Sequence, residues 1–65
     1  MKIAENLKKI RESRNLSQAE LAVKSGVSQT LITHIENGLK IPSLATCFSI
    51  AEVLETTVDE LCKGA

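Results

Sequence analysis

Uncharged polar side chains cluster in one short segment of this sequence, between apolar residues that have helical spacing. Ile32 and Ile35 lie three residues apart, so on a helix they share one side, which we expect to be buried. The polar residues around them then face outward, either as an ordinary solvated surface or as hydrogen-bonding groups for base-pair edges. Glutamine suits the edge of adenine, and threonine offers thymine a hydroxyl and a methyl group. The outward-facing residues are Gln29, Thr30, Thr33 and His34.

The amino end of the preceding segment could bind an anion. Ser17 and Glu20 form a capping-box pattern, in which each side chain bonds the backbone N–H of the other residue, so a helix begins there. The amino end of a helix has free backbone N–H groups and a partial positive charge. Gln18 lies at this end, where its amide and its backbone N–H can hold a phosphate.

Apolar spacing and capping signals predict an all-α fold of five short helices, with one domain over residues 1–65. Small residues and a glycine in the turn between the second and third helices are typical of a helix-turn-helix, whose second helix enters the major groove of DNA. The expected helices run from about residue 2 to Arg14, from Ser17 to Ser25, from Ser28 to Asn37, from Ser43 to Leu54, and from Thr57 through Leu61.

Composition excludes several classes of protein. The 65 residues are 43% apolar and 25% charged, which provides a core and argues against disorder. No apolar run is long enough to span a membrane and no signal peptide opens the chain, so we expect a cytoplasmic protein. Cys47 and Cys62 are too few and too far apart for a disulfide framework or a zinc site. No nucleophile–base pair or phosphate loop stands out, and we expect no enzyme, cofactor, metal or small-molecule ligand.

The charges are divided unevenly although their sum is zero. Residues 1–40 hold seven basic and four acidic side chains, whereas residues 41–65 hold one basic and four acidic side chains. A basic end can face an anionic partner while an acidic end faces away from it. Ordinary solvated charge explains the same distribution equally well.

The ordered motifs resemble the lambda-repressor-like, Cro/XRE-type DNA-binding domain. The resemblance covers nearly the whole chain and implies a five-helix domain that binds operator DNA as a two-fold dimer. The matching segments are Leu16-Ser17-Gln18-Ala19-Glu20-Leu21-Ala22, Gly26-Val27-Ser28, Ile32, Ile35-Glu36-Asn37-Gly38, Pro42-Ser43-Leu44, Ile50-Ala51, Leu54 and Val58-Asp59-Glu60-Leu61.

The resemblance also implies roles for individual residues. Ser28, Gln29, Thr30, Thr33 and His34 fall where the family reads bases or holds the flanking phosphates, and Gln29 is the foremost candidate for base readout. The resemblance further implies an ion pair between Arg11 and Glu36, which would tie the first helix to the end of the third. The positions that correspond to phosphate contacts are Ser17, Gln18, Asn37 and Lys40. Ser17 is better explained as a helix cap, with phosphate contact as a secondary role. An ordinary surface lysine explains Lys40 equally well.

The sequence departs from the family pattern at two positions that bear on the site. Leu31 is apolar where the family has a small or polar residue, so it either contacts a thymine methyl or is half-buried. Glu55 stands where the family often has a glycine at the end of the fourth helix. A left-handed backbone is unfavourable for glutamate, and we expect this helix to end differently.

Phe48 lies off the apolar stripe of the fourth helix, which indicates either a partner surface or a ring folded over the edge of the core. With Val53 and Val58 it marks a candidate homodimer interface. The sequence as a whole predicts a transcriptional regulator that binds double-stranded DNA sequence-specifically. A protein-interaction module with the same fold and no DNA binding is the alternative, favoured by the zero net charge.

Overall fold

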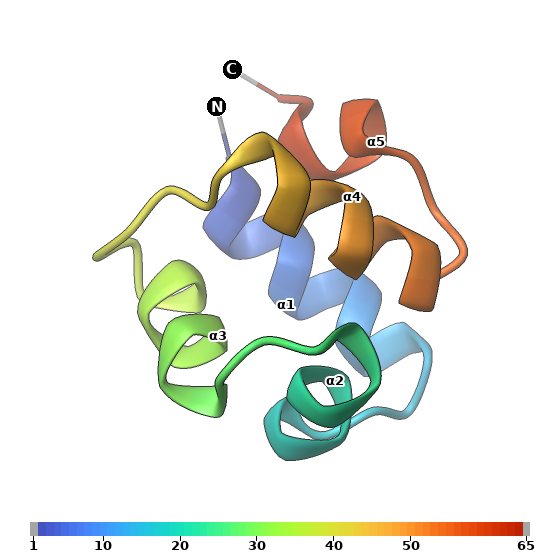
Figure 1. Ribbon diagram of the computed structural model, residues 1–65. Coiled ribbons are helices and arrows are strands. Elements are labelled where there is room, and N and C mark those ends of the chain that lie inside the picture. Colours follow the sequence, from blue (N-terminus) through green and yellow to red (C-terminus); the bar gives the residue numbers. More distant parts are fainter. Residues whose placement is uncertain (1, 65) are drawn as a thin grey trace.

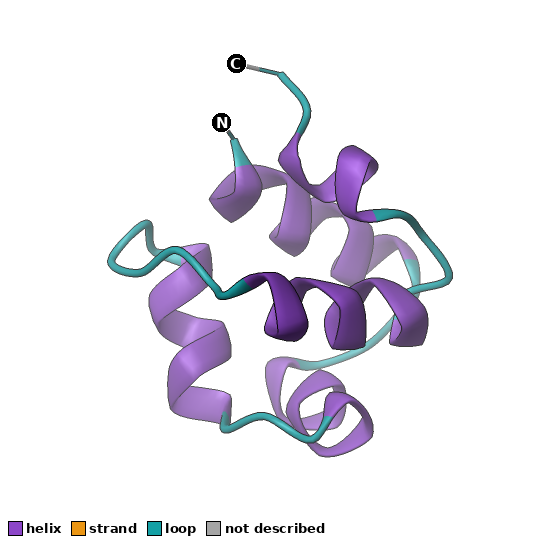
Figure 2. Cartoon of the chain, turned by 45° about the horizontal axis from the view of Figure 1, so that its top comes forward, coloured by secondary structure: helices purple, strands orange, loops and turns teal. Residues whose placement is uncertain are grey.

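The computed structural model describes residues 2–64, and in this part of the chain all regular structure is helical (Figures 1 and 2). Within these residues, the predicted all-α architecture with five helices is confirmed. The helices are α1 (Ile3–Ser13), α2 (Gln18–Ser25), α3 (Gln29–Glu36), α4 (Leu44–Val53) and α5 (Val58–Cys62).

Four of the helices begin at a hydroxyl residue that caps their free N–H groups. Ser17, Ser28, Ser43 and Thr57 each have extended backbone and accept a hydrogen bond from the N–H three residues later. Such a cap stabilises a helix by about 1 kcal/mol. In α2 the predicted capping box is complete, because the Glu20 carboxylate also accepts from the Ser17 N–H at 2.9 Å. These hydrogen bonds lower the pKa of the Glu20 carboxyl group.

The core lies where the apolar sides of all five helices meet. Helix α1 packs against α3 and α5, and α4 packs against α2 and α5. Ile32 and Ile35 on α3 are completely buried, as their spacing predicted, and Cys47 is a buried core residue of α4. Leu44 shares the spacing of the α4 stripe but is exposed, since it is the first residue of that helix. The remaining core members are Ile3, Leu7, Leu21, Ala22, Ile50, Ala51, Leu54 and Leu61.

The helices α2 and α3 lie side by side at one end of the molecule, joined by the short turn predicted between them (Figure 1). Gly26 ends α2 in the left-handed conformation with φ of +74°, which a glycine adopts without steric cost. The acidic helix α5 lies at the opposite end, against α1 and α4 (Figure 1).

The expectation that Glu55 would change the end of α4 is wrong. Glu55 adopts the left-handed conformation with φ of +55°, and the following N–H of Thr56 bonds the Ala51 carbonyl at 2.9 Å. A left-handed backbone costs a residue with a Cβ roughly 1 kcal/mol or more. The left-handed residue lets the chain turn from α4 toward α5. The exposed Glu55 carboxylate also pairs with Arg14.

Replacing Glu55 with glycine should relieve this backbone strain. We expect Glu55→Gly to have a free energy of unfolding about 1 kcal/mol higher than Glu55→Ala, measured by urea denaturation. Alanine is the matched control, because both variants lose the ion pair with Arg14 and only glycine accepts the left-handed backbone. Equal stability of the two variants would show that the turn is not strained.

Candidate nucleic-acid interface

The outer side of α3 presents uncharged hydrogen-bonding groups on a firmly anchored helix. Ser28, Gln29 and Thr30 are exposed, whereas Thr33 and His34 are half-buried. The Ser28 hydroxyl accepts from the Leu31 N–H at 3.1 Å, so its first role is to cap the helix. The structure thus gathers all five predicted base-reading residues at the amino end and outer side of α3.

Leu31 is half-buried and packs against the core. Of the two possibilities open for this residue, the structure favours packing over a contact with thymine.

An ion pair between Arg11 and Glu36 joins α1 to the end of α3. Arg11 Nε donates to Glu36 Oε2 at 2.7 Å, and Arg11 Nη2 donates to Glu36 Oε1 at 3.1 Å. The two side chains are only 10% and 3% exposed. Arg11 Nη1 also donates to the carbonyl of Leu16 at 2.7 Å, in the connection that leads to α2. The hydrogen bonds to Glu36 raise the pKa of Arg11, and the pair fixes three segments relative to one another.

Gln18 extends this ion pair into a network across the helix-turn-helix. Its Nε2 donates to Glu36 Oε1 at 3.0 Å, and its Oε1 accepts from the Thr33 hydroxyl at 2.9 Å. From the sequence, Gln18 was expected to contact phosphate and Thr33 to contact bases, and the hydrogen bond between them was not expected. The residues are 15 positions apart on different helices, and their polarity was the only signal that the sequence offered.

The other predicted phosphate residues are Ser17, Asn37 and Lys40. Ser17 is exposed, and its hydroxyl accepts from the Glu20 N–H at 3.0 Å. Asn37 is exposed at the carboxyl end of α3, and Lys40 is exposed in the loop that follows. No side-chain hydrogen bond or ion pair of either residue is recorded within residues 2–64, so both side chains are available to an anion.

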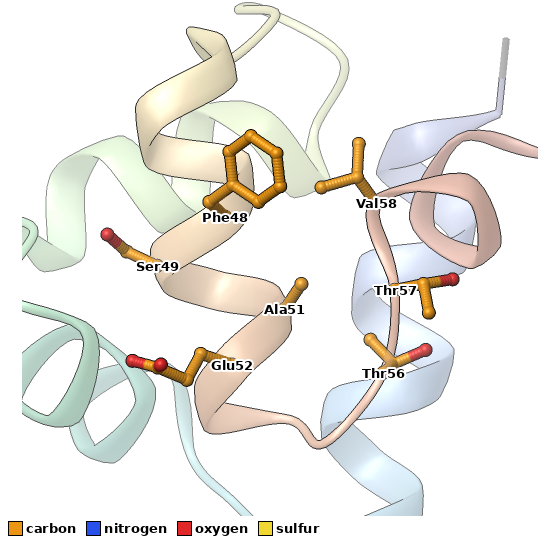
Figure 3. A pocket seen from close by; sticks show the side chains of 7 residues that line it. All are labelled: Phe48, Ser49, Ala51, Glu52, Thr56, Thr57 and Val58. Carbon is orange, nitrogen blue, oxygen red and sulfur yellow. The ribbon is translucent and has the colours of Figure 1, made fainter.

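The candidate dimer residues do not form one cluster. Phe48 is 59% exposed and faces Val58 across an open hollow of about 440 Å³ between α4 and the segment that leads into α5 (Figure 3). Val53 is half-buried against the core and does not line this hollow. Sequence reasoning missed Ser49, Glu52, Thr56 and Thr57, the polar lining residues, because no local pattern joins the two sides.

Further large apolar side chains are exposed on α4 and just before it. Leu44 and Phe48 lie four residues apart on α4, and Ile41 precedes the helix and lines a different hollow; all three are exposed. Leu39, in the loop before α4, is exposed as well. A small protein rarely leaves so many large apolar side chains in water unless they meet a partner.

Within residues 2–64 no three histidine, cysteine or acidic side chains are grouped as they would be around a metal ion. In the same part of the chain no helix is long and apolar enough to cross a membrane.

A family model described as helix-turn-helix matches residues 7–61. The chain belongs to this helix-turn-helix family. The CTXphi phage transcriptional repressor RstR of Vibrio cholerae is 39% identical over 62 residues, which are 95% of this chain and 55% of RstR. The chain spans about half the length of the first curated relatives it matches.

Solved structures agree with the helix-turn-helix assignment. A crystal structure of SinR, the master regulator for biofilm formation, in complex with DNA has a TM-score of 0.91 and 31% identity. The match covers 94% of this chain and 98% of that one. The restriction-modification controller protein C.AhdI from Aeromonas hydrophila has a TM-score of 0.87 and 29% identity, over 91% of this chain and 89% of that one.

The buried ion pair should matter far more than the exposed one. We expect Glu36→Gln to lower the free energy of unfolding by about 3 kcal/mol, because it leaves Arg11 buried without its counter-charge. Glu55→Gln is the matched control, since the Arg14–Glu55 pair is 44% and 77% exposed and should contribute below about 1 kcal/mol. Urea denaturation of both variants measures the difference, and similar losses would contradict it.

Proposed function

We propose that this protein is a transcriptional regulator that binds double-stranded DNA sequence-specifically, as a homodimer on a two-fold symmetric operator. The outer side of α3 enters the major groove, and Gln29 is the principal base-reading residue. The amino end of α2, with Asn37 and Lys40, holds the phosphate backbone. The single observation that carries this proposal is the exposed polar side of α3, held in place by two completely buried isoleucines.

The geometry of α3 suits direct readout of bases. Gln29 and Thr30 lie in its first turn and are exposed, so they can approach base edges before the rest of the helix does. The Gln29 side chain can form two hydrogen bonds with adenine: its NH₂ donates to N7, and its carbonyl oxygen accepts from the N6 amino group. The buried side of the helix holds it rigidly, which limits the entropy lost on binding.

Phosphate contacts would fix the position of α3 on the duplex. The Gln18 amide uses one Nε2 proton for Glu36, which leaves its second proton for a phosphate oxygen near the positive end of α2. Lys40 supplies a positive charge beyond the far end of α3. Because α3 itself carries no Arg or Lys, we expect modest affinity and a specificity that depends on neutral hydrogen bonds.

The comparisons support regulation of transcription through DNA. RstR is a phage repressor by name, C.AhdI is a restriction-modification controller, and the matched SinR structure is a DNA complex. We infer that the present chain acts by occupying its operator, as a phage-type repressor, a restriction-modification controller or an antitoxin-like autoregulator. Two copies would place their third helices about 34 Å apart in successive major grooves.

A protein-interaction module is the second candidate, because the net charge is zero and several large apolar side chains are exposed. The salt dependence of binding to genomic DNA fragments separates the two functions. A DNA-binding regulator loses affinity steeply as salt rises, with a log–log slope of about −0.9 for each phosphate neutralised. Absence of binding at low salt would favour the interaction module.

Gln29→Ala tests base readout. We expect it to weaken binding to the selected operator by about 1–3 kcal/mol and binding to random DNA very little, because only the operator offers the matching base edge. Fluorescence anisotropy with both DNAs measures the two losses. Lys40→Ala is the control and should weaken both complexes to a similar extent. Equal losses for Gln29→Ala would remove this residue from base readout.

Phe48→Glu tests the dimer. We expect a shift from dimer to monomer in sedimentation velocity, because a negative charge would replace the apolar ring that faces Val58, in a hollow that Glu52 also lines. Phe48 is exposed, so the monomer should keep its helical content in circular dichroism. Val23→Glu is the matched control, since Val23 is 83% exposed on α2 and does not line the hollow. An unchanged dimer in Phe48→Glu would exclude this face.

A further inference from the structure

The direction of every hydrogen bond in the network around Glu36 can be deduced from its chemistry. A carboxylate only accepts hydrogen bonds, and Glu36 is 3% exposed and paired with Arg11. The Gln18 atom that lies 3.0 Å from Glu36 Oε1 is therefore the amide nitrogen, because a carbonyl there would face an acceptor without a proton between them. Glu36 thus fixes which way the Gln18 amide is turned.

This orientation decides the direction of the next hydrogen bond. With its nitrogen toward Glu36, Gln18 turns its carbonyl oxygen to the Thr33 hydroxyl at 2.9 Å. A carbonyl oxygen only accepts, so Thr33 must donate, and a hydroxyl has a single proton. The lone pairs of Thr33 Oγ1 remain, and they can only accept.

We propose that Thr33 reads DNA as an acceptor only and selects a base with an amino group in the major groove, adenine or cytosine, at the position it faces. This inference rests on the proposed function and specifies one of its contacts. Adenine offers its N6 amino group and cytosine its N4 amino group, whereas guanine O6 and thymine O4 are themselves acceptors. Phosphate oxygens are acceptors too, so Thr33 as oriented cannot donate to the DNA backbone.

Thr33 differs in this respect from the other threonine of α3. Thr30 is exposed, and no side-chain hydrogen bond of Thr30 is recorded within residues 2–64. Its hydroxyl can rotate to donate or to accept, which gives it no preference between amino and keto bases. The two threonines lie on the same helix, and only Thr33 has its proton committed inside the protein.

Selection of binding sites from a random duplex pool, followed by sequencing, tests the inference. For the wild-type protein we expect one position in each half-site at which adenine or cytosine is preferred on one strand, by about fivefold, the contribution of one hydrogen bond. Thr33→Val, which has nearly the same shape, should lose this preference at that position only. Thr33→Ser should keep it, because serine retains the hydroxyl.

Gln18→Ala tests the cause of the preference. Without the Gln18 carbonyl, the Thr33 proton is free and the hydroxyl can donate to guanine or thymine, so the fivefold preference should fall to nearly equal use of all four bases. Thr30→Val is the matched control and should leave the position that Thr33 reads unchanged. Circular dichroism of each variant verifies that the helices are intact.

The possible outcomes distinguish failure of this inference from failure of the proposed DNA-binding function. A preference for guanine or thymine that disappears in Thr33→Val would show that Thr33 donates, and would overturn the inference. A preference that survives in Thr33→Val, or that persists in Gln18→Ala, would overturn it as well. In each of these cases a selected site exists and the proposed function stands. If the wild-type protein enriches no site at all, the proposed function fails and the inference fails with it.

Discussion

The carboxylate of Glu36 imposes the constraint on which the candidate interface depends. A buried negative charge is costly unless it is paired and its hydrogen-bonding capacity is used. Arg11 supplies the charge and two donors, and Gln18 supplies a third donor. These partners come from α1 and α2, whereas Glu36 is the last residue of α3. Satisfying one buried anion therefore holds three helices in a single arrangement.

The same constraint links the core to the surface that would meet DNA. Arg11 also donates a hydrogen bond to the Leu16 carbonyl. Gln18, which donates to Glu36, accepts a hydrogen bond from the Thr33 hydroxyl, so the network extends to α3. A flexible glutamine at the amino end of α2 would lose more side-chain entropy on binding a ligand than Gln18, whose amide nitrogen and oxygen are both already hydrogen-bonded. Burial of Glu36 thus orders the side chains of two half-buried polar residues, Gln18 and Thr33.

The candidate interface and the acidic helix α5 lie at different ends of the molecule. The polar side of α3 and the amino end of α2 lie together, and the acidic α5 lies away from them (Figure 1). An acidic patch beside the proposed DNA face would repel phosphates, so its distance favours binding. The hollow between Phe48 and Val58 lies on the α4–α5 side (Figure 3). A dimer formed there would leave α3 of each copy uncovered.

The amino-acid sequence predicted most of the helix boundaries, because capping hydroxyls, glycines and apolar spacing act over three or four residues. It also identified Ile32 and Ile35 as buried and thereby the side of α3 that faces outward. The resemblance supplied the pairing of Arg11 with Glu36, which spacing alone could not. Three features became visible only in the folded protein: Gln18 bonds Thr33, Glu55 has a left-handed backbone, and Phe48 faces Val58 while Val53 packs against the core. Each of these depends on how whole helices pack, and packing brings together residues whose separation along the chain carries no local signal.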